Sequence, residues 1–407
     1  MSQYYCPNAL TNVYLTRSNK THVLNMKNVL ILHNSLDYCK SGVERVSFLL
    51  RNELECRSYN CFEGCVKGEN VIHQKNVFEY DFNEPQRKVS ADLFAYINEH
   101  DVGVIIIQGL FDPNLNKALF RLKKKRICKI VFCLHNAPSA YKRKTPLSLL
   151  SRIKIFIWYL IKFKIIILDY RNHRLKMLAE MFGVADRFVL LSKTYIDELS
   201  QIIKKKSLDK ISCINNPLSF RFSKVDFSQK KQQVLILGRL EEFQKNISSA
   251  LRIWKMVENA GIDDWTLLVV GSGGDEQKLK DYAADIHLKN CTFLGKTSEP
   301  EKYYQESALF MMTSHIEGWP MTLLEAQQFG SIPVVFNSFA ALSEIIEHKV
   351  NGFVVERNNE SLFAKTLVDL MRNNVMRRKM FQDCINRSQK YSSKFFGDNW
   401  DTLLRNL

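Results

Sequence analysis

The sequence of 407 residues lacks several features that would assign it to a particular class of protein. Residues 1–26 contain no apolar stretch, so we expect no secretory signal. No tandem repeat is present, which disfavours a solenoid. The ten cysteines are scattered, and the cluster of Cys56, Cys61 and Cys65 matches no common zinc spacing. We therefore expect a cytoplasmic protein with reduced thiols, no bound metal and no cofactor.

A long hydrophobic run is also missing. The most apolar segment is Leu149–Asp169, and its longest uncharged run is the seven residues Ile155–Ile161. Because a spanning helix needs about 20 apolar residues, this segment is not expected to cross a membrane. Its basic residues, Arg152, Lys154, Lys162 and Lys164, favour a helix that lies on an anionic surface. A buried helix with a solvated basic edge is the alternative.

Acidic residues are scarce in the first half of the chain. The net charge is +16, and residues 1–220 hold 34 Lys and Arg against 19 Asp and Glu. Between Arg121 and Lys176 the only acid is Asp169. This asymmetry indicates an anionic partner for one half, which could be a membrane surface, an acidic acceptor or nucleic acid. No nucleic-acid-binding motif is recognisable, so we expect a membrane surface on the inner face of the cell membrane.

Short apolar runs alternate with segments of helix length along the whole chain, which predicts parallel sheets with crossover helices. The predicted strands are Asn28–His33, Val102–Gln108, Ile127–Leu134, Arg187–Ser192, Lys210–Ile214, Gln233–Leu237, Trp265–Gly271, Cys291–Gly295, Ala308–Thr313, Pro333–Phe336 and Gly352–Val355. The polar segment 216–231 separates two Rossmann-like halves. We expect domains at 1–220 and 221–388, facing each other across a cleft, and a final helix at 389–407 that packs back on the first domain.

The segment Glu317–Glu325 (EGWPMTLLE) carries the strongest chemical signal. Pro320 is well placed to open a helix, and Gly318 lets the backbone approach a ligand. The free N–H groups of a helix N-terminus suit a phosphate, and the two carboxylates can bind hydroxyl groups. An ordinary loop followed by a helix is the alternative interpretation.

Three further features lie at the ends of predicted strands. Arg239 and Lys245 follow one strand and can converge on a diphosphate. Gly42 lies in a turn that leads into an amphipathic helix, which also suits phosphate. His135 ends a buried strand, where a structural role is the alternative. Each of these signals is weak alone, because loop cations are usually solvated and such turns are common.

In this order, these residues resemble the retaining glycosyltransferases of family 4 (glycosyl transferases group 1), which have the GT-B fold. The similarity is dense from Gly238 to Val355 and thin before it, and Ser41 departs from the glycine common in the family. The resemblance implies a donor site for a nucleotide-sugar, with Arg239 and Lys245 on the diphosphate and Gly42 approaching it. Glu325 would bind the ribose, Glu317 the transferred sugar, and His135 would lie near that sugar. The implied backbone contacts are Gly318, Trp319, Pro320, Met321, Thr322 and Leu323.

The expected activity is therefore metal-independent transfer of a hexose-type sugar with retention of configuration. No Asp-x-Asp motif is present to hold a metal, so the two cations would take its place. A UDP-sugar donor is favoured, then a GDP-sugar, with a saccharide or lipid-linked acceptor in bacterial envelope, lipopolysaccharide or capsule biosynthesis. The alternatives are a nucleotide-sugar epimerase of the same fold, a relative that only binds nucleotide, and a basic nucleic-acid- or membrane-binding protein without transferase activity.

Overall fold

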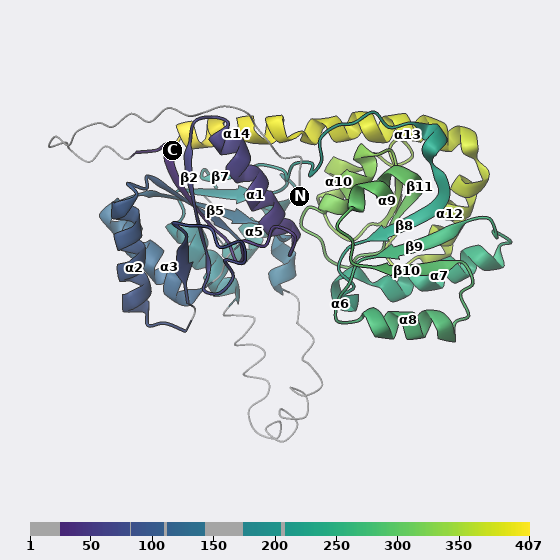
Figure 1. Cartoon of the computed structure of the whole chain (residues 1–407), viewed down its shortest axis with the longest axis horizontal. Helices are drawn as coiled ribbons and strands as arrows, with labels where there is room; N and C mark the ends of the chain where they lie inside the picture. The colour runs from purple at the N-terminus through teal and green to yellow at the C-terminus, as the bar shows by residue number, and fades with distance from the viewer. Residues whose placement is uncertain (1–24, 82, 110–111, 143–173, 205–207) are drawn as a thin grey trace, which may run out of the picture. The chain divides into compact units, whose positions relative to one another are not determined.

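The computed structural model describes residues 25–81, 83–109, 112–142, 174–204 and 208–407 (Figure 1). They form two parallel sheets, with strand orders β3-β2-β1-β4-β5-β6-β7 and β10-β9-β8-β11-β12-β13. By their contacts, the described residues divide into two compact units. The first unit contains those within 1–133, 180–188 and 397–407, and the second contains the rest.

The seven-stranded sheet is built from the first half of the chain. Its strands are β1 (Asn28–Leu32), β2 (Asn60–Val66), β3 (Phe78–Tyr80), β4 (Val104–Gln108), β5 (Lys129–Leu134), β6 (Arg187–Leu190) and β7 (Ile211–Cys213). The accompanying helices are α1 (Gly42–Glu55), α2 (Gln86–Glu99), α3 (Pro113–Lys125), η1 (Pro138–Lys142) and α5 (Tyr195–Ile203). Every residue of β1 and β4 is buried, which explains why these strands are continuous apolar runs.

Two strands of this sheet, β2 and β3, were not predicted. β2 pairs with β1 in parallel, with Glu63 opposite Ile31, and β3 pairs with β2. The polar Asn60 and Glu63 and the small Gly64 interrupt the apolar pattern of β2, and β3 is only three residues long. Neither segment has the pattern by which a buried strand is recognised in a sequence.

The six-stranded sheet contains β8 (Lys231–Leu237), β9 (Thr266–Val270), β10 (Cys291–Gly295), β11 (Ser307–Met312), β12 (Ile332–Phe336) and β13 (Phe353–Val355). Its helices are α6 (Glu242–Lys245), α7 (Ile247–Asn259), α8 (Glu276–Asp285), α9 (Pro300–Glu306), α10 (Met321–Gln328), α11 (Leu342–Ile345), α12 (Glu360–Arg372) and α13 (Asn374–Ser388). The short helix η2 (Phe227–Gln229) precedes β8, and η3 (Gln389–Tyr391) precedes α14 (Ser393–Arg405). The core of this sheet includes the fully buried Trp254 and Trp265.

The alternation of parallel strands and helices in both sheets confirms the prediction of two Rossmann-like α/β domains. Within each sheet, the carboxyl ends of the parallel strands meet at one edge, where doubly wound folds bind their ligands. For the second sheet this edge holds the residues that follow β8, β9 and β11.

Residues 397–407, the last part of the chain, group with the first unit. The guanidinium of Arg57 contacts the carboxylate of Asp398 at 2.6 Å, and the hydroxyl of Tyr59 donates to Asp401 at 2.8 Å. A Cβ atom at Gly397 would lie 2.3 Å from Nη1 of Arg57, so a larger residue at this position would displace the end of the Arg57 side chain.

No helix in the described part of the chain is long and apolar enough to cross a membrane. The predicted surface helix at Leu149–Asp169 lies outside the described residues. The described part of the basic stretch includes the last turn of α3, where Lys123, Lys124 and Lys125 follow one another.

Candidate active site

Two glycine-containing loops pack backbone against backbone at the carboxyl edge of the second sheet. Gly238 follows β8 and Gly271 follows β9, both with positive φ, at 156° and 138°. The amide of Leu240 donates to the carbonyl of Ser272 at 2.9 Å. A Cβ atom at Gly271 would lie 1.8 Å from the carbonyl oxygen of Gly238. Glycine is therefore required where the two loops meet.

Gly271→Ala is expected to lower the free energy of unfolding by about 2 kcal/mol or more, because its methyl group would overlap main-chain atoms in a strained conformation. Gly274→Ala is the matched control in the same loop, since a Cβ atom there meets nothing within 4 Å. Urea unfolding of both variants measures the difference. Equal stability of the two variants would contradict the predicted contact.

The loop after β8 continues into α6, whose last residue is Lys245, and Asn246 follows in a left-handed conformation with φ of 52°. The side chain of Asn246 donates to the carbonyl of Thr313 at 3.2 Å, and the hydroxyl of Thr313 donates to the carbonyl of Asn246 at 2.9 Å. This reciprocal pair attaches the turn to the end of β11. The backbone of Lys245 is thereby fixed at the carboxyl edge of the sheet.

An ion pair joins two of the predicted site residues that lie far apart in the sequence. The ammonium of Lys245 lies 2.7 Å from Oε1 of Glu317, and the two side chains are 18% and 7% exposed. A charge-assisted hydrogen bond with this little solvent is stronger than an exposed one. The pair presents a cation and a carboxylate side by side, which are the groups needed for a phosphate and for a sugar hydroxyl.

Arg239 lies on the same loop but is more exposed. Its guanidinium donates to Glu241 at 3.2 Å and to Gln244 at 3.3 Å. The carbonyl of Gln244 accepts from the amide of His315 at 2.8 Å, and its side-chain amide donates to the carbonyl of Ile316 at 3.4 Å. Gln244 therefore connects Arg239 to the segment that leads into Glu317.

A pocket opens where these segments converge, at the carboxyl ends of β8 and β11. Its lining includes Gly238, Arg239, Lys245, Thr313, Ser314 and Thr322. Arg239 and Lys245 carry positive charge, and the hydroxyl-bearing residues can donate to oxygen atoms. The pocket therefore combines cations and hydroxyl donors, which suit an anionic, oxygen-rich ligand.

The segment from Glu317 to Pro320 leads into α10, which begins at Met321, so Pro320 directly precedes the helix as predicted. The carbonyl of Gly318 accepts from the hydroxyl of Tyr195 at 2.6 Å. A Cβ atom at Gly318 would lie 1.9 Å from the carbonyl oxygen of His135. The structure thus brings His135 next to the predicted loop, through the backbone of both residues.

The remaining residues of this loop and of the first turn of α10 are mostly buried. Trp319 is 4% exposed and packs edge to face on Tyr391, and Met321 and Leu323 belong to the core. Thr322 lines the pocket. Of the side chains from Trp319 to Leu323, it is therefore Thr322 that reaches the pocket, while any contact of the others with a ligand would have to be made by their backbone.

His135 follows β5, and its Nδ1 atom is shielded from solvent. Desolvation lowers the pKa of His135 from its ordinary 6.5 to about 4. The imidazole is therefore neutral at neutral pH and can accept or donate a hydrogen bond without carrying a charge.

Acid is expected to destabilise the fold through His135. Because the folded pKa is below the unfolded value, the unfolded chain binds more protons as pH falls from 6.5 towards 4, and stability is lost over that window. Between pH 7.5 and pH 5, we expect the free energy of unfolding of the wild type to fall by about 2 kcal/mol more than that of His135→Gln. Urea unfolding at both pH values measures this. An identical pH dependence in the two proteins would refute it.

Glu325 is inside α10, and its carboxylate is bound by the hydroxyl groups of two other residues. It is 1% exposed, and its carboxylate accepts hydrogen bonds from the hydroxyls of Ser219 and Tyr304. Tyr304 is itself fully buried against Phe329 and Phe310. A role of Glu325 at a ribose would require a hydroxyl group to join or replace these two donors.

Gly42 lies in the first unit, as the first residue of α1. Ser41 caps this helix by accepting from the amide of Val43, and its hydroxyl also contacts the carboxylate of Glu44. The Ser-x-x-Glu spacing is that of a capping box, and here Glu44 contacts the hydroxyl of Ser41. Gly42 itself is exposed, so its backbone is accessible to a ligand.

Among the residues that the structure describes, no group of three or more His, Cys, Asp and Glu side chains could hold a metal ion. Burial raises the pKa of the Cys65 thiol to about 12, which disfavours the thiolate that zinc would need. Independence from metal and cofactors stays a prediction for the protein as a whole.

Sequence reasoning missed several residues of this site, among them Gln244, Thr313 and Tyr195. Gln244 lies between Arg239 and Lys245, and Thr313 ends a predicted strand. Their positions in the sequence could therefore have indicated that they belong to the site. Tyr195 is in the first half of the chain and contacts Gly318, 123 residues away. A contact of this range leaves no pattern in a single sequence.

The sequence and the fold were compared with known proteins. Residues 220–390 match the family described as glycosyl transferases group 1. The chain is 27% identical over 304 residues to the amylovoran biosynthesis glycosyltransferase AmsD of Erwinia amylovora. The aligned region covers 74% of this chain and 75% of AmsD.

Two solved structures are similar over most of the chain. HepE of Anabaena, solved with UDP and glucose, matches with a TM-score of 0.71 at 15% identity, over 93% of this chain and 100% of HepE. A TarM mutant from S. aureus, solved with fondaparinux, alpha-GlcNAc-glycerol and UDP, matches with a TM-score of 0.69 at 13% identity, over 93% of this chain and 100% of TarM. The family match is therefore confined to residues 220–390, and over 93% of its length the chain shares its fold of two Rossmann-like domains with HepE, which is the GT-B fold.

Proposed function

We propose that this protein is a retaining glycosyltransferase that moves a hexose-type sugar from a nucleotide-sugar to a saccharide or lipid-linked acceptor. The observation that carries the proposal is the Lys245–Glu317 ion pair at 2.7 Å, beside a pocket lined by Arg239 and Thr322. This pair would offer a cation to the leaving diphosphate and a carboxylate to the sugar. We infer a role in bacterial envelope polysaccharide biosynthesis from the relationship to AmsD.

UDP-sugar is the favoured donor, and GDP-sugar is the second candidate. HepE and TarM were both solved with UDP, which supports a uridine nucleotide here. The pocket residues carry charges and hydroxyl groups suited to phosphate, and these would bind the diphosphate of a UDP-sugar or of a GDP-sugar.

In the proposed reaction, the bond between the anomeric carbon and the diphosphate oxygen breaks, and the nucleoside diphosphate leaves with the electron pair. The acceptor hydroxyl attacks the same face of the sugar and gives its proton to the departing phosphate, so configuration is retained. Negative charge grows on the leaving group, and the fixed cations Arg239 and Lys245 stabilise it. The N–H groups at the start of α10 would add to this stabilisation.

The sugar is proposed to lie near Glu317 and His135. Glu317 would accept hydrogen bonds from sugar hydroxyls, and the neutral imidazole of His135 would bind without repelling the oxocarbenium-like sugar. Glu325 is proposed to bind the ribose, in which case a ribose hydroxyl would share the carboxylate with Ser219 or Tyr304.

The direct test mixes the purified protein with UDP-sugars and GDP-sugars, with and without a lipid-linked saccharide acceptor, and measures nucleoside diphosphate release. We expect release that depends on acceptor, and NMR of the product should show the anomeric configuration of the donor. Conversion of donor to a different nucleotide-sugar without acceptor would favour an epimerase. Inverted configuration in the product would refute the retaining mechanism.

Transfer is expected to proceed without a divalent metal. The chain has no Asp-x-Asp motif, and the two cations can take the place of a metal at the diphosphate. We expect turnover in excess EDTA to stay within about twofold of that in Mg²⁺, which is a negligible difference in activation free energy. Loss of activity in EDTA with recovery in Mg²⁺ or Mn²⁺ would show that this part of the mechanism is wrong.

We also propose that the protein works at the inner face of the cell membrane, held there by the basic stretch Arg121–Lys176. Each basic side chain near an anionic leaflet contributes roughly 1 kcal/mol, and salt screens this attraction. Co-sedimentation with anionic vesicles at low ionic strength, and its loss with neutral vesicles, is the corresponding measurement.

A further inference from the structure

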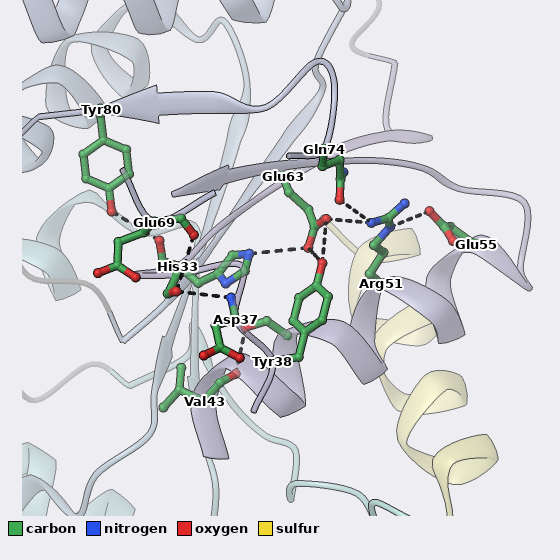
Figure 2. A network of polar contacts seen from close by, with 12 residues as sticks. His33, Asp37, Tyr38, Val43, Arg51, Glu55, Glu63, Glu69, Gln74 and Tyr80 are labelled. Atoms are coloured by element: carbon green, nitrogen blue, oxygen red, sulfur yellow. Dashed lines mark hydrogen bonds and ion pairs between the residues drawn. The ribbon is translucent and has the colours of Figure 1, made fainter. Parts of the chain in front are cut away.

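The carboxylate of Glu63 shows how a shielded charge is accommodated in this protein (Figure 2). Glu63 lies in β2, beside the loop 34–41 that connects β1 to α1, and its side chain is 0% exposed. Nη1 of Arg51 lies 2.6 Å from Oε2 of Glu63, and the hydroxyl of Tyr38, in this loop, donates to the same carboxylate at 3.1 Å. The network that surrounds the loop thus pairs the buried charge, as a low-dielectric interior requires.

Arg387, near the end of α13 in the second unit, forms no ion pair with any residue that the structure describes. Its Nη2 atom donates to the main-chain carbonyl of Glu344 at 2.7 Å. Its Nε atom is shielded from solvent and has no hydrogen-bond partner among the described residues. A shielded donor without a partner is rare in folded proteins, and a bound water, ion or ligand commonly explains it.

A pocket of about 590 Å³ opens beside Arg387. Its lining residues all belong to the second unit, so its geometry is defined within one compact body. They include Asn215, Arg387, Gln389, Lys390, Tyr391 and Phe395. A pocket of several hundred cubic ångströms is of the ordinary size for a small-molecule site.

The charges in this pocket favour an anion. Arg387 and Lys390 are positive, and the acidic lining residue, Glu344, has its carboxylate engaged elsewhere. Oε1 of Glu344 accepts from the hydroxyl of Ser192 at 2.6 Å and from the amide of Lys193 at 3.0 Å. Because these donors already stabilise the negative charge of Glu344, the two cations are left available for an acidic group of a ligand.

The rest of the lining suits a sugar ring. Phe395 is 55% exposed and lines the pocket, where an aromatic ring can cover the apolar C–H face of a sugar. The side-chain amides of Asn215 and Gln389 and the hydroxyl of Ser392 can donate to and accept from sugar hydroxyls. A single exposed apolar residue is ordinary on a surface, but this one shares its pocket with planar polar groups and two cations.

The pocket adjoins the loop that carries Glu317 but differs from the pocket at Arg239 and Lys245. Tyr391 lines it and packs edge to face on Trp319 of that loop, with 5.4 Å between the ring centroids. Among the residues of the described ranges, none lines both pockets. A ligand held here would therefore lie near the candidate active site without occupying the proposed diphosphate position.

We propose that this pocket is a second ligand site, which binds an acidic saccharide, meaning a sugar ring that carries a carboxylate or a phosphate. Arg387 and Lys390 bind the acidic group, and the ring lies against Phe395. The inference goes beyond the proposed function, because it concerns a site outside the donor pocket and its test requires no transfer reaction.

The experiment titrates the full-length protein with glucuronate, glucose 6-phosphate and glucose by calorimetry at low ionic strength. We expect both acidic sugars to bind, and glucose to bind roughly 10-fold more weakly, the scale of losing one hydrogen bond to a charged group. Binding of the acidic sugars should weaken as salt is added, because salt screens the attraction to the two cations.

Single variants then locate the site. Lys390→Ala and Phe395→Ala should each raise the Kd of glucose 6-phosphate by roughly 5-fold, with little change in melting temperature because both side chains are exposed. Arg387→Gln should raise this Kd further, since a half-buried guanidinium makes the stronger charge-assisted hydrogen bond. Lys379→Ala, which removes an exposed lysine of α13 outside the pocket, is the matched control and should bind like the wild type.

Arg239→Ala separates this site from the donor pocket. Unchanged affinity for glucose 6-phosphate in Arg239→Ala, with weaker binding in Lys390→Ala and Phe395→Ala, would support the second site. Loss of binding in Arg239→Ala with wild-type affinity in Lys390→Ala and Phe395→Ala would place the sugar in the donor pocket and overturn the proposal.

Three further results would also overturn it: no binding of either acidic sugar at millimolar concentration, equal affinities for glucose and the acidic sugars, or equal losses in Lys379→Ala and Lys390→Ala. None of these results depends on whether a nucleotide-sugar is turned over. A protein that fails to transfer any sugar would refute the proposed function and leave the second ligand site to be decided by these titrations.

Discussion

Replacement of Lys245 by alanine is expected to slow sugar transfer by roughly 10²-fold or more, the scale of losing one preorganised charge donor. Lys245 is 18% exposed and has its backbone fixed by the Asn246–Thr313 pair, so its ammonium is held in place before a ligand arrives. Its charge would oppose the negative charge that grows on the leaving diphosphate. Turnover with a UDP-sugar should fall, and the Kd of UDP, measured by calorimetry, should rise.

Lys231→Ala is the matched control for this prediction. Lys231 forms an ion pair of similar length with Glu306, at 2.8 Å, outside the pocket. Its removal should leave both turnover and UDP affinity unchanged. Arg239→Ala should resemble Lys245→Ala, because both cations line the pocket. Unchanged UDP affinity in both Arg239→Ala and Lys245→Ala would defeat the assignment of the diphosphate site.

Glu317→Gln is expected to depress turnover by roughly 10²-fold while sparing the binding of free UDP. The amide keeps the shape of the side chain but removes its charge, and the sugar would lose its carboxylate. UDP carries no sugar beyond its ribose, so its affinity should stay the same or increase. An increase is reasonable because Lys245 would no longer be paired with a carboxylate that competes with phosphate. Measured kcat and UDP affinity separate the two effects.

Glu306→Gln, which removes the carboxylate of the control ion pair, should change neither quantity. Weaker UDP binding in Glu317→Gln, with normal binding in Glu325→Gln, would show that the roles of the two glutamates are exchanged. The burial of Glu325 adds a second expectation. Its replacement should lower the stability of the fold, because the hydroxyls of Ser219 and Tyr304 would lose a charged acceptor.

Much of the fold was predictable from the sequence for a simple physical reason. Strands that are buried on both faces must be apolar throughout, and β1, β4 and β12 are of this kind. The start of α10 after Pro320 was predictable as well, because proline at the beginning of a helix is a local preference. Strand β2 was missed because Glu63 and Gly64 break its pattern, although the strand is central to the network that surrounds the loop 34–41.

By itself, the sequence determined the apolar strands, their alternation with helices and the residue types that stand at the strand ends, because these depend on neighbours along the chain. Only the tertiary structure decided that Lys245 pairs with Glu317, that the backbone of Gly318 meets His135, and that Glu325 is enclosed by Ser219 and Tyr304. It also decided that Glu63 is a paired, buried charge. Such contacts join residues that are far apart in the sequence, so they depend on how the chain packs, and no local pattern records them.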